Sequence, residues 1–282
     1  MQNEIKIDKN LPSDFTNFRI SKSTQETLKS KKINSLFPIQ SATFDYLFEG
    51  NDLIGRDRTG SGKTLAFSLP ILERFRKNNQ FKDHSHIKML IMVPTRELTN
   101  QTFNTMNSLK NTNEEFQSLS IYGGTSIEKQ INSLKRGVDI LIATPGRLID
   151  LMDRNEVDFS NLEVVVFDET DEMLKIGFQK DIEYIIDLIQ KDLNEKQLQF
   201  LMFSATVPAW VKGIARRYMK KNHYYVNMIQ ENLNQTSETV EHFKVSAFNF
   251  HQKFELISNF VSVHVGKKGR CIIFTNTKSN FF

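Results

Sequence analysis

From residue 50 to about residue 227, short apolar runs alternate with longer amphipathic or polar stretches. Several runs are apolar at every position, which indicates strands buried on both faces between two layers of helices. This alternation is typical of strand-helix-strand units, and it predicts an α/β fold with a doubly wound parallel sheet. The runs that we interpret as strands are residues 52–54, 89–93, 119–122, 139–142, 164–167, 200–203 and 224–226.

The stretches between these runs predict helices. In residues 177–190, apolar side chains such as Ile182, Ile186 and Ile189 recur near the i, i+3 and i+4 spacing of a helix with one buried face. A face of this kind must be covered by a sheet or by another helix. The clearest helical predictions cover residues 63–74, 97–109 and 177–190.

The bulk composition allows a large core but identifies no function. Of the 282 residues, 39% are hydrophobic and 23 are Phe, which is enough to fill a packed core. The 37 basic and 33 acidic residues leave a net charge of only +4, too little by itself to indicate nucleic-acid binding. Any ligand must therefore be inferred from motifs.

The cysteine content and the lack of long apolar segments restrict the class of protein. Cys271 is the one cysteine of the sequence, which excludes an intramolecular disulfide framework and most zinc modules. It stands in the apolar run 271–274, which predicts a buried thiol on a strand. The N-terminus has no apolar signal core, and no stretch approaches the ~18 apolar residues of a membrane span. These features predict an intracellular protein with no membrane partner.

The chain divides into four segments by composition. Residues 228–239 are polar with little periodicity and predict a linker between a first domain, 33–227, and a second unit, 240–282; residues 1–32 form an N-terminal extension. Two strands and one helix bury too little apolar surface to be stable alone, so we interpret the second unit as the truncated start of a domain. Its predicted elements are a strand at 240–247, a helix at 248–261 and a strand at 270–275.

Residues 55–64, Gly-Arg-Asp-Arg-Thr-Gly-Ser-Gly-Lys-Thr, follow a predicted strand and open a predicted helix, which is the context of a phosphate-binding loop. Small residues let successive backbone N–H groups surround a phosphate, and the helix N-terminus adds positive potential. Lys63 would neutralise terminal phosphate charge, and the Thr64 hydroxyl would ligate Mg²⁺. The nucleotide-binding residues predicted in this loop are Thr59, Gly60, Ser61, Gly62, Lys63 and Thr64.

One position departs from the strict loop pattern. The pattern requires glycine five residues before Gly62, and the chain has Asp57 there. A carboxylate is bulkier than the turn prefers, and its charge would oppose an anionic ligand. Asp57 therefore makes nucleotide affinity the property most in need of measurement.

The apolar run 164–167 delivers two acids, Asp168 and Glu169, at its C-terminal end, where ligands bind in an open parallel sheet. Taken alone, such acids could be a solvated turn that closes a strand. Together with the phosphate loop they predict a hydrolytic site. Asp168 would hold Mg²⁺, Glu169 would orient and deprotonate the water that attacks the γ-phosphate, and Lys63 completes the predicted catalytic set.

With its further motifs, the chain resembles the DEAD-box family of ATP-dependent RNA helicases, over about residues 14–278. The resemblance implies a RecA-like P-loop NTPase domain with helices on both faces of a parallel sheet, followed by a partial second RecA-like domain. It implies ATP and Mg²⁺ as cofactors and RNA as a partner, bound through its backbone without base reading. The motifs that carry it are Pro-Thr-Arg-Glu-Leu at 94–98, Gly-Gly at 123–124, Thr-Pro-Gly-Arg at 144–147, Asp-Glu-Thr-Asp at 168–171 and Ser-Ala-Thr at 204–206.

The resemblance also implies roles for single residues. Gln40, in the Phe-Pro-Ile-Gln segment 37–40, would read the adenine edge and Phe15 would stack on the base, although Lys32-Ile33 replaces the usual Gly-Phe opening of this motif. Ser204 and Thr206 would couple hydrolysis to strand separation. The RNA backbone would contact Thr95, Arg96, Gly123, Gly124, Thr144, Gly146 and Arg147.

Flanking spellings at 36–40, 209–211, 218–220 and 240–242 resemble the nucleolar RNA helicase II (Gu) branch, which implies a nuclear or nucleolar location. A non-catalytic, helicase-derived protein that binds RNA or a protein partner is the main alternative, because both Asp57 and the truncation permit it. A DNA helicase or a P-loop transporter ATPase is disfavoured by segments 37–40 and 144–147. The sequence names no protein partner.

Residues 271–278 resemble the first motif of the family's second domain, and the segment with that domain's arginine fingers would follow Phe282. Such a finger is worth ~10³–10⁵ in rate. We therefore expect residues 1–282 alone to bind nucleotide but to show little RNA-stimulated hydrolysis. An ATPase assay with and without RNA measures this, and turnover at the level usual for the family would contradict it.

Overall fold

The computed structural model describes residues 3–5, 11–111, 116–193, 198–229, 241, 243–246, 250–265 and 269–274. The chain divides into two compact units, Met1–Glu231 and Asn232–Phe282. The finer boundaries at residues 32, 227 and 239 stay predictions.

The first unit is built on an eight-stranded sheet with the order β1-β8-β2-β7-β6-β3-β5-β4, in which every recorded pairing is parallel. Each predicted run overlaps a strand, so the predicted doubly wound parallel sheet is confirmed. The two-residue strand β1 at the edge had no clear sequence signal. The strands are β1 Asn3–Glu4, β2 Leu53–Arg56, β3 Met89–Met92, β4 Ser118–Ile121, β5 Ile140–Ala143, β6 Val164–Phe167, β7 Gln199–Ser204 and β8 Tyr224–Asn227.

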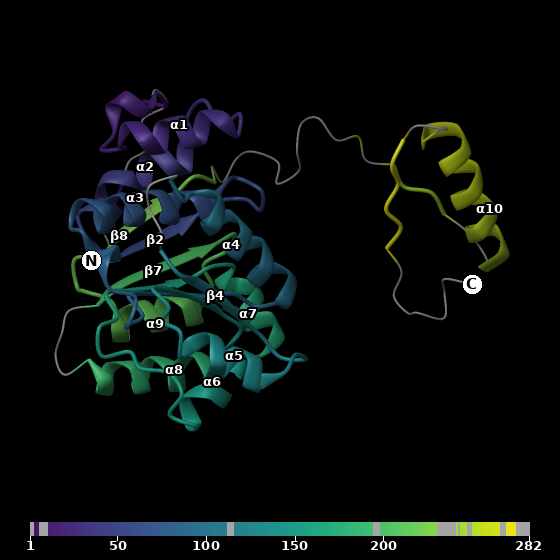
Figure 1. Ribbon diagram of the computed structural model, residues 1–282. Coiled ribbons are helices and arrows are strands. Elements are labelled where there is room, and N and C mark those ends of the chain that lie inside the picture. The colour runs from purple at the N-terminus through teal and green to yellow at the C-terminus, as the bar shows by residue number, and fades with distance from the viewer. Residues whose placement is uncertain are drawn as a thin grey trace. The chain divides into compact units, whose positions relative to one another are not determined.

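Helices cover both faces of this sheet, and the three clearest helical predictions are confirmed (Figure 1). Short 3₁₀ turns lie at Phe15–Asn17 and Gln80–Lys82. The helices on one face are α1 Lys22–Ser30, α2 Pro38–Phe48, α3 Lys63–Lys77 and α4 Arg96–Ser108. Those on the other face are α5 Ile127–Leu134, α6 Pro145–Asp153, α7 Thr170–Ile176, α8 Gln179–Asp192 and α9 Ala209–Tyr218.

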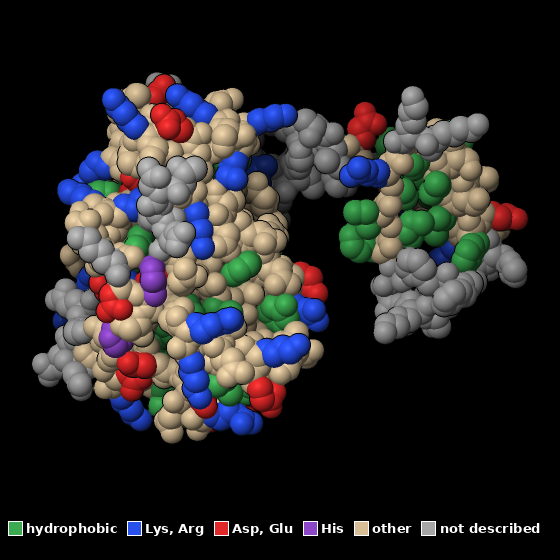
Figure 2. Space-filling model, viewed as in Figure 1, with side chains coloured by type: hydrophobic (Ala, Val, Ile, Leu, Met, Phe, Trp, Pro, Cys, Tyr) green, Lys and Arg blue, Asp and Glu red, His purple; other side chains and the backbone are tan. Residues whose placement is uncertain are grey.

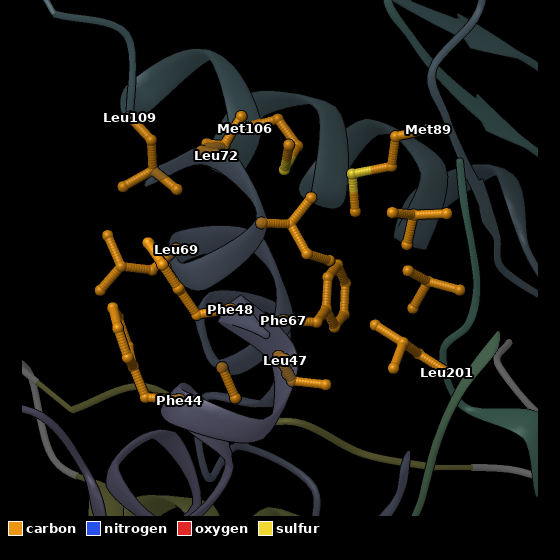
Figure 3. Packing of buried hydrophobic residues seen from close by; sticks show 14 of the residues in the cluster. Phe44, Leu47, Phe48, Phe67, Leu69, Leu72, Met89, Met106, Leu109 and Leu201 are labelled. Carbon is orange, nitrogen blue, oxygen red and sulfur yellow. The ribbon is translucent and has the colours of Figure 1, made fainter. Parts of the chain in front are cut away.

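The two faces of the sheet form two hydrophobic clusters, because successive side chains of a strand point to opposite faces. In β6, Val164 and Val166 join the cluster beneath α2 and α3, whereas Val165 and Phe167 join the cluster against α8 and α9. The first cluster interlocks aromatic and aliphatic side chains of α2 and α3 with strand residues such as Leu201 (Figure 3). Each large apolar side chain fully buried in this way contributes about 1.5–3 kcal/mol.

The second unit contains α10, Phe250–Phe260, which continues into a π-helical turn at Val261–Val265. This helix agrees with the prediction for 248–261. The strands predicted at 240–247 and 270–275 are wrong for the residues that the structure describes there, which form no strand.

The reason for this difference is a lack of partners. A strand needs the backbone groups of a neighbouring strand and an apolar layer on its face, and the described residues of this unit provide neither for the described parts of these segments. Phe243, Ile272 and Phe274 are 68%, 79% and 91% exposed, and hydrophobic side chains gather on the surface of this unit (Figure 2). Cys271 is exposed for the same reason, so its prediction as a buried strand thiol is also wrong.

None of the helices in the described parts of the chain has both the length and the apolar content that crossing a bilayer requires.

Gly55 allows β2 and β7 to pack closely. A Cβ atom at Gly55 would lie 2.6 Å from Cε1 of Phe203, the ring opposite it in β7, which packs against Phe67 at 5.4 Å between ring centroids. We predict that Gly55→Ala lowers the free energy of unfolding by about 1–3 kcal/mol, because a buried ring has to move. Urea unfolding measures this.

Gly213 provides the matched control. It lies inside α9, where a Cβ atom would meet nothing within 4 Å, and alanine is favoured over glycine by about 1 kcal/mol in a helix. Gly213→Ala should therefore raise the unfolding midpoint. Equal effects of the two substitutions would contradict the packing argument.

Candidate functional site

The loops predicted to bind nucleotide, to hydrolyse it and to couple hydrolysis to strand separation are attached to three strands that are neighbours in the sheet. Residues 55–64 follow or overlap the end of β2, 204–206 follow β7, and 168–171 follow β6, and the sheet order places these strands side by side. Because parallel strands end at the same edge, all three loops meet at one place.

The loops predicted to contact RNA follow the next three strands of the same edge. Residues 94–98 follow β3, 144–147 follow β5 and 123–124 follow β4, and these strands are again consecutive in the sheet. The carboxyl edge of the sheet is therefore divided into two adjoining halves that meet between β6 and β3.

The phosphate loop needs glycine at two positions. Gly60 and Gly62 have φ angles of 80° and 86°, in the left-handed region that other residues adopt with strain. Gly62 caps the N-terminus of α3, and a Cβ atom there would lie 2.4 Å from Nε2 of Gln40. The backbone N–H groups at the start of α3 thus remain available to an anion.

Lys63 is buried between this loop and the acidic segment. Its Nζ donates hydrogen bonds to the carbonyl oxygens of Asp57 at 3.2 Å and Arg58 at 3.0 Å, and it lies 3.5 Å from Oε1 of Glu169. The Lys63 side chain is only 4% exposed. The Lys63 ammonium group therefore connects the phosphate loop to the acidic segment after β6.

Asp57 does not crowd the loop in the way its position predicts. Its φ angle is not positive, so the backbone at this position does not require glycine. Its carboxylate accepts a hydrogen bond from the Arg58 N–H at 2.8 Å, and its own N–H donates to the Ser204 carbonyl at 3.1 Å. The Asp57 carboxylate is thus hydrogen-bonded to the backbone of the next residue.

Asp168 and Thr64 form a set of oxygen ligands. The Thr64 hydroxyl donates to Oδ2 of Asp168 at 3.3 Å, and Oδ1 accepts from the Glu169 N–H at 3.0 Å. Burial, together with the nearby negative charge of Glu169, raises the pKa of Asp168 to about 7. A buried carboxylate beside a hydroxyl fits a hard divalent cation, which would supply the positive charge that burial makes necessary.

Glu169 has a φ angle of 51°, the left-handed conformation that is strained for a residue with a side chain. Strain of this kind is concentrated at functional sites, where the surrounding structure enforces it. Here the turn from β6 into α7 imposes it, and the carboxylate is brought to Lys63 with 15% of its side chain exposed.

Asp171, the last acid of the segment, binds the Ser-Ala-Thr loop. Its Oδ2 accepts hydrogen bonds from the Thr206 N–H at 3.0 Å and the Thr206 hydroxyl at 2.9 Å, and its N–H donates to the Ser204 hydroxyl at 3.2 Å. Burial would raise the pKa of Asp171, but the hydroxyls of Ser204 and Thr206 lower it below its usual value. These three hydrogen bonds join the segment after β6 to the loop after β7.

Gln40 lies beside the phosphate loop, whereas the ring of Phe15 is buried and is not exposed at this loop. Gln40 accepts from the Phe37 N–H at 2.8 Å and donates to the Gly62 carbonyl at 3.1 Å. Phe15 is 2% exposed in the cluster beneath α2 and α3. Phe37, by contrast, is 55% exposed, and one of its ring carbons would lie 3.1 Å from a Cβ atom placed on Gly62.

In the RNA half of the edge, the predicted residues differ in how accessible they are. Thr95 caps the N-terminus of α4, and the Arg96 guanidinium lies 4.9 Å from the centroid of the Tyr122 ring. Thr144 caps α6. A Cβ atom would meet nothing within 4 Å at Gly123, Gly124 or Gly146, so a ligand can approach the backbone closely at these positions.

Arg147 is engaged within the protein. Its side chain is 9% exposed, and its guanidinium donates to the Gln130 amide oxygen at 2.8 Å and the Thr125 carbonyl at 3.1 Å. It thereby ties the loop after β5 to the loop after β4. Its role as a direct RNA contact stays a prediction.

Sequence reasoning missed three side chains at this edge: Phe37, Gln130 and Asp171. The first lay within a recognised motif, but its exposure could not be read from an apolar residue beside a proline. Gln130 has no local signal, because its partner Arg147 is 17 residues away in the chain. Asp171 stood in the quoted acidic motif, and only the contact with Thr206 shows its use.

Comparison with known proteins points to one family. A family model described as DEAD/DEAH box helicase matches residues 37–214. The mouse ATP-dependent RNA helicase DDX50 is 40% identical over 267 residues, a match that covers 94% of this chain but 36% of that protein. Rat nucleolar RNA helicase 2 is 35% identical over 283 residues, covering 98% of this chain and 36% of the relative.

Solved structures agree with these relatives. A DEAD box protein from Methanococcus jannaschii superposes with a TM-score of 0.69 at 29% identity, over 88% of this chain and 63% of that one. The yeast DEAD-box splicing factor Prp28 has a TM-score of 0.69 at 30% identity, over 86% of this chain and 57% of its own. The chain thus spans about a third of the curated relatives' length and about six tenths of the length of these two structures.

The raised pKa of Asp168 predicts a pH-dependent stability. Between its unfolded value of 3.8 and about 7, the folded protein holds a proton that the unfolded chain releases. Stability contributed by this group is therefore lost as the pH rises through about 7. In a chelating buffer, the unfolding free energy of Asp168→Asn minus that of the wild type should increase by about 1–3 kcal/mol from acidic to mildly alkaline pH. Urea unfolding at each pH measures this, and a difference that stays constant with pH would contradict it.

Proposed function

Because the chain belongs to the DEAD/DEAH box helicase family, we propose that it binds ATP with Mg²⁺ and an RNA strand at the carboxyl edge of its sheet, and that the protein acts as an ATP-dependent RNA helicase or RNA remodelling enzyme. The observation that carries the proposal is the convergence of Lys63 on Glu169 at 3.5 Å and of Thr64 on Asp168 at 3.3 Å, next to the three loops that follow β3, β5 and β4.

The hydrolytic roles follow from the positions of the side chains. Lys63, held at the loop, would bind terminal phosphate oxygens and oppose the charge that develops on them. Glu169, beside it, would orient the attacking water and accept its proton. Thr64 and Asp168 would hold Mg²⁺, which bridges phosphate oxygens and neutralises their charge.

The adenine side of the site would use Gln40 and an aromatic ring. The two hydrogen bonds of Gln40 within the chain use one donor and one acceptor, and a carboxamide has a second of each for the edge of a base. Phe15 is enclosed by the core, whereas Phe37 presents an exposed ring beside Gly62. We therefore assign base stacking to Phe37 in place of Phe15.

The RNA half would recognise the backbone without reading bases. Backbone N–H groups and hydroxyls at the open loops suit phosphates and 2′-hydroxyls, and Arg96 adds a charge. Thr95, Gly123, Gly124, Thr144 and Gly146 are the proposed contacts, and Arg147 would position their loops.

The network from Asp171 to Ser204 and Thr206 would couple the two halves. It joins the segment that carries Asp168 and Glu169 to the loop after β7, and the Ser204 carbonyl also binds the N–H of Asp57 at the start of the phosphate loop. A change at the γ-phosphate would reach all three loops through these bonds.

The names of several relatives contain the word nucleolar, and on that ground we propose a nuclear, nucleolar location for the protein. Fluorescently tagged protein seen only outside the nucleus would contradict it.

Nucleotide titration tests the site. We expect residues 1–282 to bind ADP with Mg²⁺, and Lys63→Ala to weaken binding by roughly 10–100-fold because charged hydrogen bonds are lost. Asp57→Ala should change affinity only a few-fold, since its carboxylate is bound to the Arg58 N–H. Isothermal titration calorimetry measures all three proteins.

Two further arms make the titration specific. Phe37→Ala should weaken ADP by the ~1–3 kcal/mol of a stacking contact while leaving pyrophosphate binding unchanged. If the wild type binds no nucleotide yet still binds RNA, the enzyme proposal fails and the non-catalytic RNA-binding alternative replaces it.

A further inference from the structure

A positively charged surface lies along α9 and meets the loops of the carboxyl edge at Arg56 and Thr206. A cavity of about 510 Å³ is lined by Lys212, Arg216, Lys220, Lys221 and His223, and by the buried side chain of Met219. Carboxylates are absent from the described residues that line it. The sequence motifs and the proposed function leave this cavity unexplained.

A second cavity, of about 440 Å³, shares the Lys212 side chain with the first. It adds Arg56 and Tyr225, and it reaches Thr206 of the Ser-Ala-Thr loop; Glu4 is its acidic member. We call the two cavities, one on each side of Lys212, the α9 groove. α9 has 10 residues and is therefore ~15 Å long, enough to lie beside a few nucleotides.

The spacing of the basic residues follows from the amphipathic helix. Val211, Ile214 and Ala215 are buried against the sheet, so that Lys212 and Arg216, four residues apart, share the opposite, exposed face. A cation in the last turn favours any helix C-terminus. That general effect accounts for Arg216, but it does not explain Lys212 a turn earlier or Lys221 beyond the end of the helix.

The positive charge of the groove is not neutralised within the described residues. Lys220 lies 3.6 Å from the buried carboxylate of Asp52 and also donates to the Gly50 carbonyl at 3.2 Å. By contrast, Lys212, Arg216 and Lys221 form no ion pair with any residue that the structure describes. Three exposed cations on one groove are therefore available to an anionic partner.

Arg217 shows how a basic residue of this helix is otherwise used. Its guanidinium pairs with Asp187 at 3.2 Å and lies 4.8 Å from the centroid of the Tyr218 ring. It points away from the groove to α8, although it is the direct neighbour of Arg216. The two arginines thus form a matched pair, of which only Arg217 is ion-paired within the described part of the chain.

His223 adds an unpartnered polar atom at the same place. Its side chain is 7% exposed, and Nδ1 lies 2.8 Å from the Lys220 carbonyl, to which it donates. Nε2 has no hydrogen-bond partner among the described residues, which is costly for a buried polar atom. Because Nδ1 carries the proton, Nε2 accepts, and a hydroxyl such as the 2′-hydroxyl of a ribose is the kind of partner that would satisfy it.

We propose that the α9 groove binds the phosphodiester backbone of an RNA segment that extends beyond the helicase edge. The inference rests on the proposed function, because that function makes RNA the polyanion at hand. α9 begins next to the Ser-Ala-Thr loop at the carboxyl edge, and the segment after it leads into the start of β8 at the opposite edge of the sheet. The groove would hold a single strand by its charges without reading its sequence.

The test compares a triple variant with a control. In Lys212→Gln, Arg216→Gln, Lys221→Gln protein, the affinity for a single-stranded oligouridine of roughly 30 nucleotides is measured across a salt series. Removal of three phosphate contacts should lower the slope of log K against log salt by about 2. Arg217→Gln should leave the slope unchanged. All four positions are exposed, and ADP titration confirms that each variant keeps its fold and its nucleotide site.

Each outcome decides the question. A lower slope in the triple variant, with photo-crosslinks from 4-thiouridine RNA to α9 in the wild type, supports the groove. A triple variant that matches the wild type overturns it while leaving RNA binding at the helicase edge intact. If the wild type binds no RNA, the proposed function is wrong, and the groove proposal that rests on it is wrong as well. If polyglutamate binds the groove and RNA does not, the partner is an acidic peptide and the RNA assignment is wrong.

Discussion

The structure depends on parallel pairing of strands that are buried on both faces. Such strands can satisfy their backbone N–H and C=O groups only through neighbouring strands, because helices cover both sides and no water reaches them. Parallel pairing then brings every strand's C-terminal end to one edge. That constraint gathers loops from distant parts of the chain, and the order β2-β7-β6 followed by β3-β5-β4 decides which loops become neighbours. The second unit shows the opposite case, since its apolar segments lack neighbours and form no strand in their described residues.

At that edge, the main energetic conflict is the burial of charge. Lys63 and Asp168 are each about as buried as core side chains, at 4% and 5% exposed, and Glu169 lies beside both. Charges of this kind are costly unless they are paired and hydrogen-bonded. The Lys63 ammonium group contacts two loop carbonyls and the Glu169 carboxylate. Asp168 has a raised pKa and accepts a hydrogen bond from the Thr64 hydroxyl. An arrangement of this kind favours ligands that bring both phosphate and a divalent cation.

The chain handles its basic side chains in two ways. Arg147 and Arg217 are paired within the protein and hold loops or helices together. Arg216 and Lys212, exposed on α9, have no such partner in the described structure and give the groove its charge. Net charge does not separate these roles, because +4 over the chain is the sum of both. Location relative to carboxylates and to the sheet edge separates them.

The sequence alone was sufficient for strands β2 to β8 and for helices α3, α4 and α8, because apolar periodicity is a local property of the chain. It also predicted the set Lys63, Thr64, Asp168 and Glu169 from loop spacing, and the structure brings these four residues together. Only the tertiary structure decided what depends on contacts between distant residues. It enclosed Phe15 in the core and exposed Phe37 beside Gly62, it turned Asp57 onto its own backbone, and it engaged Arg147 with Gln130. The strand order belongs to the same group. Local sequence predicts strands β2 to β8, but pairing across the sheet chooses their neighbours, and it thereby decides which of the loops proposed to bind nucleotide and RNA lie side by side.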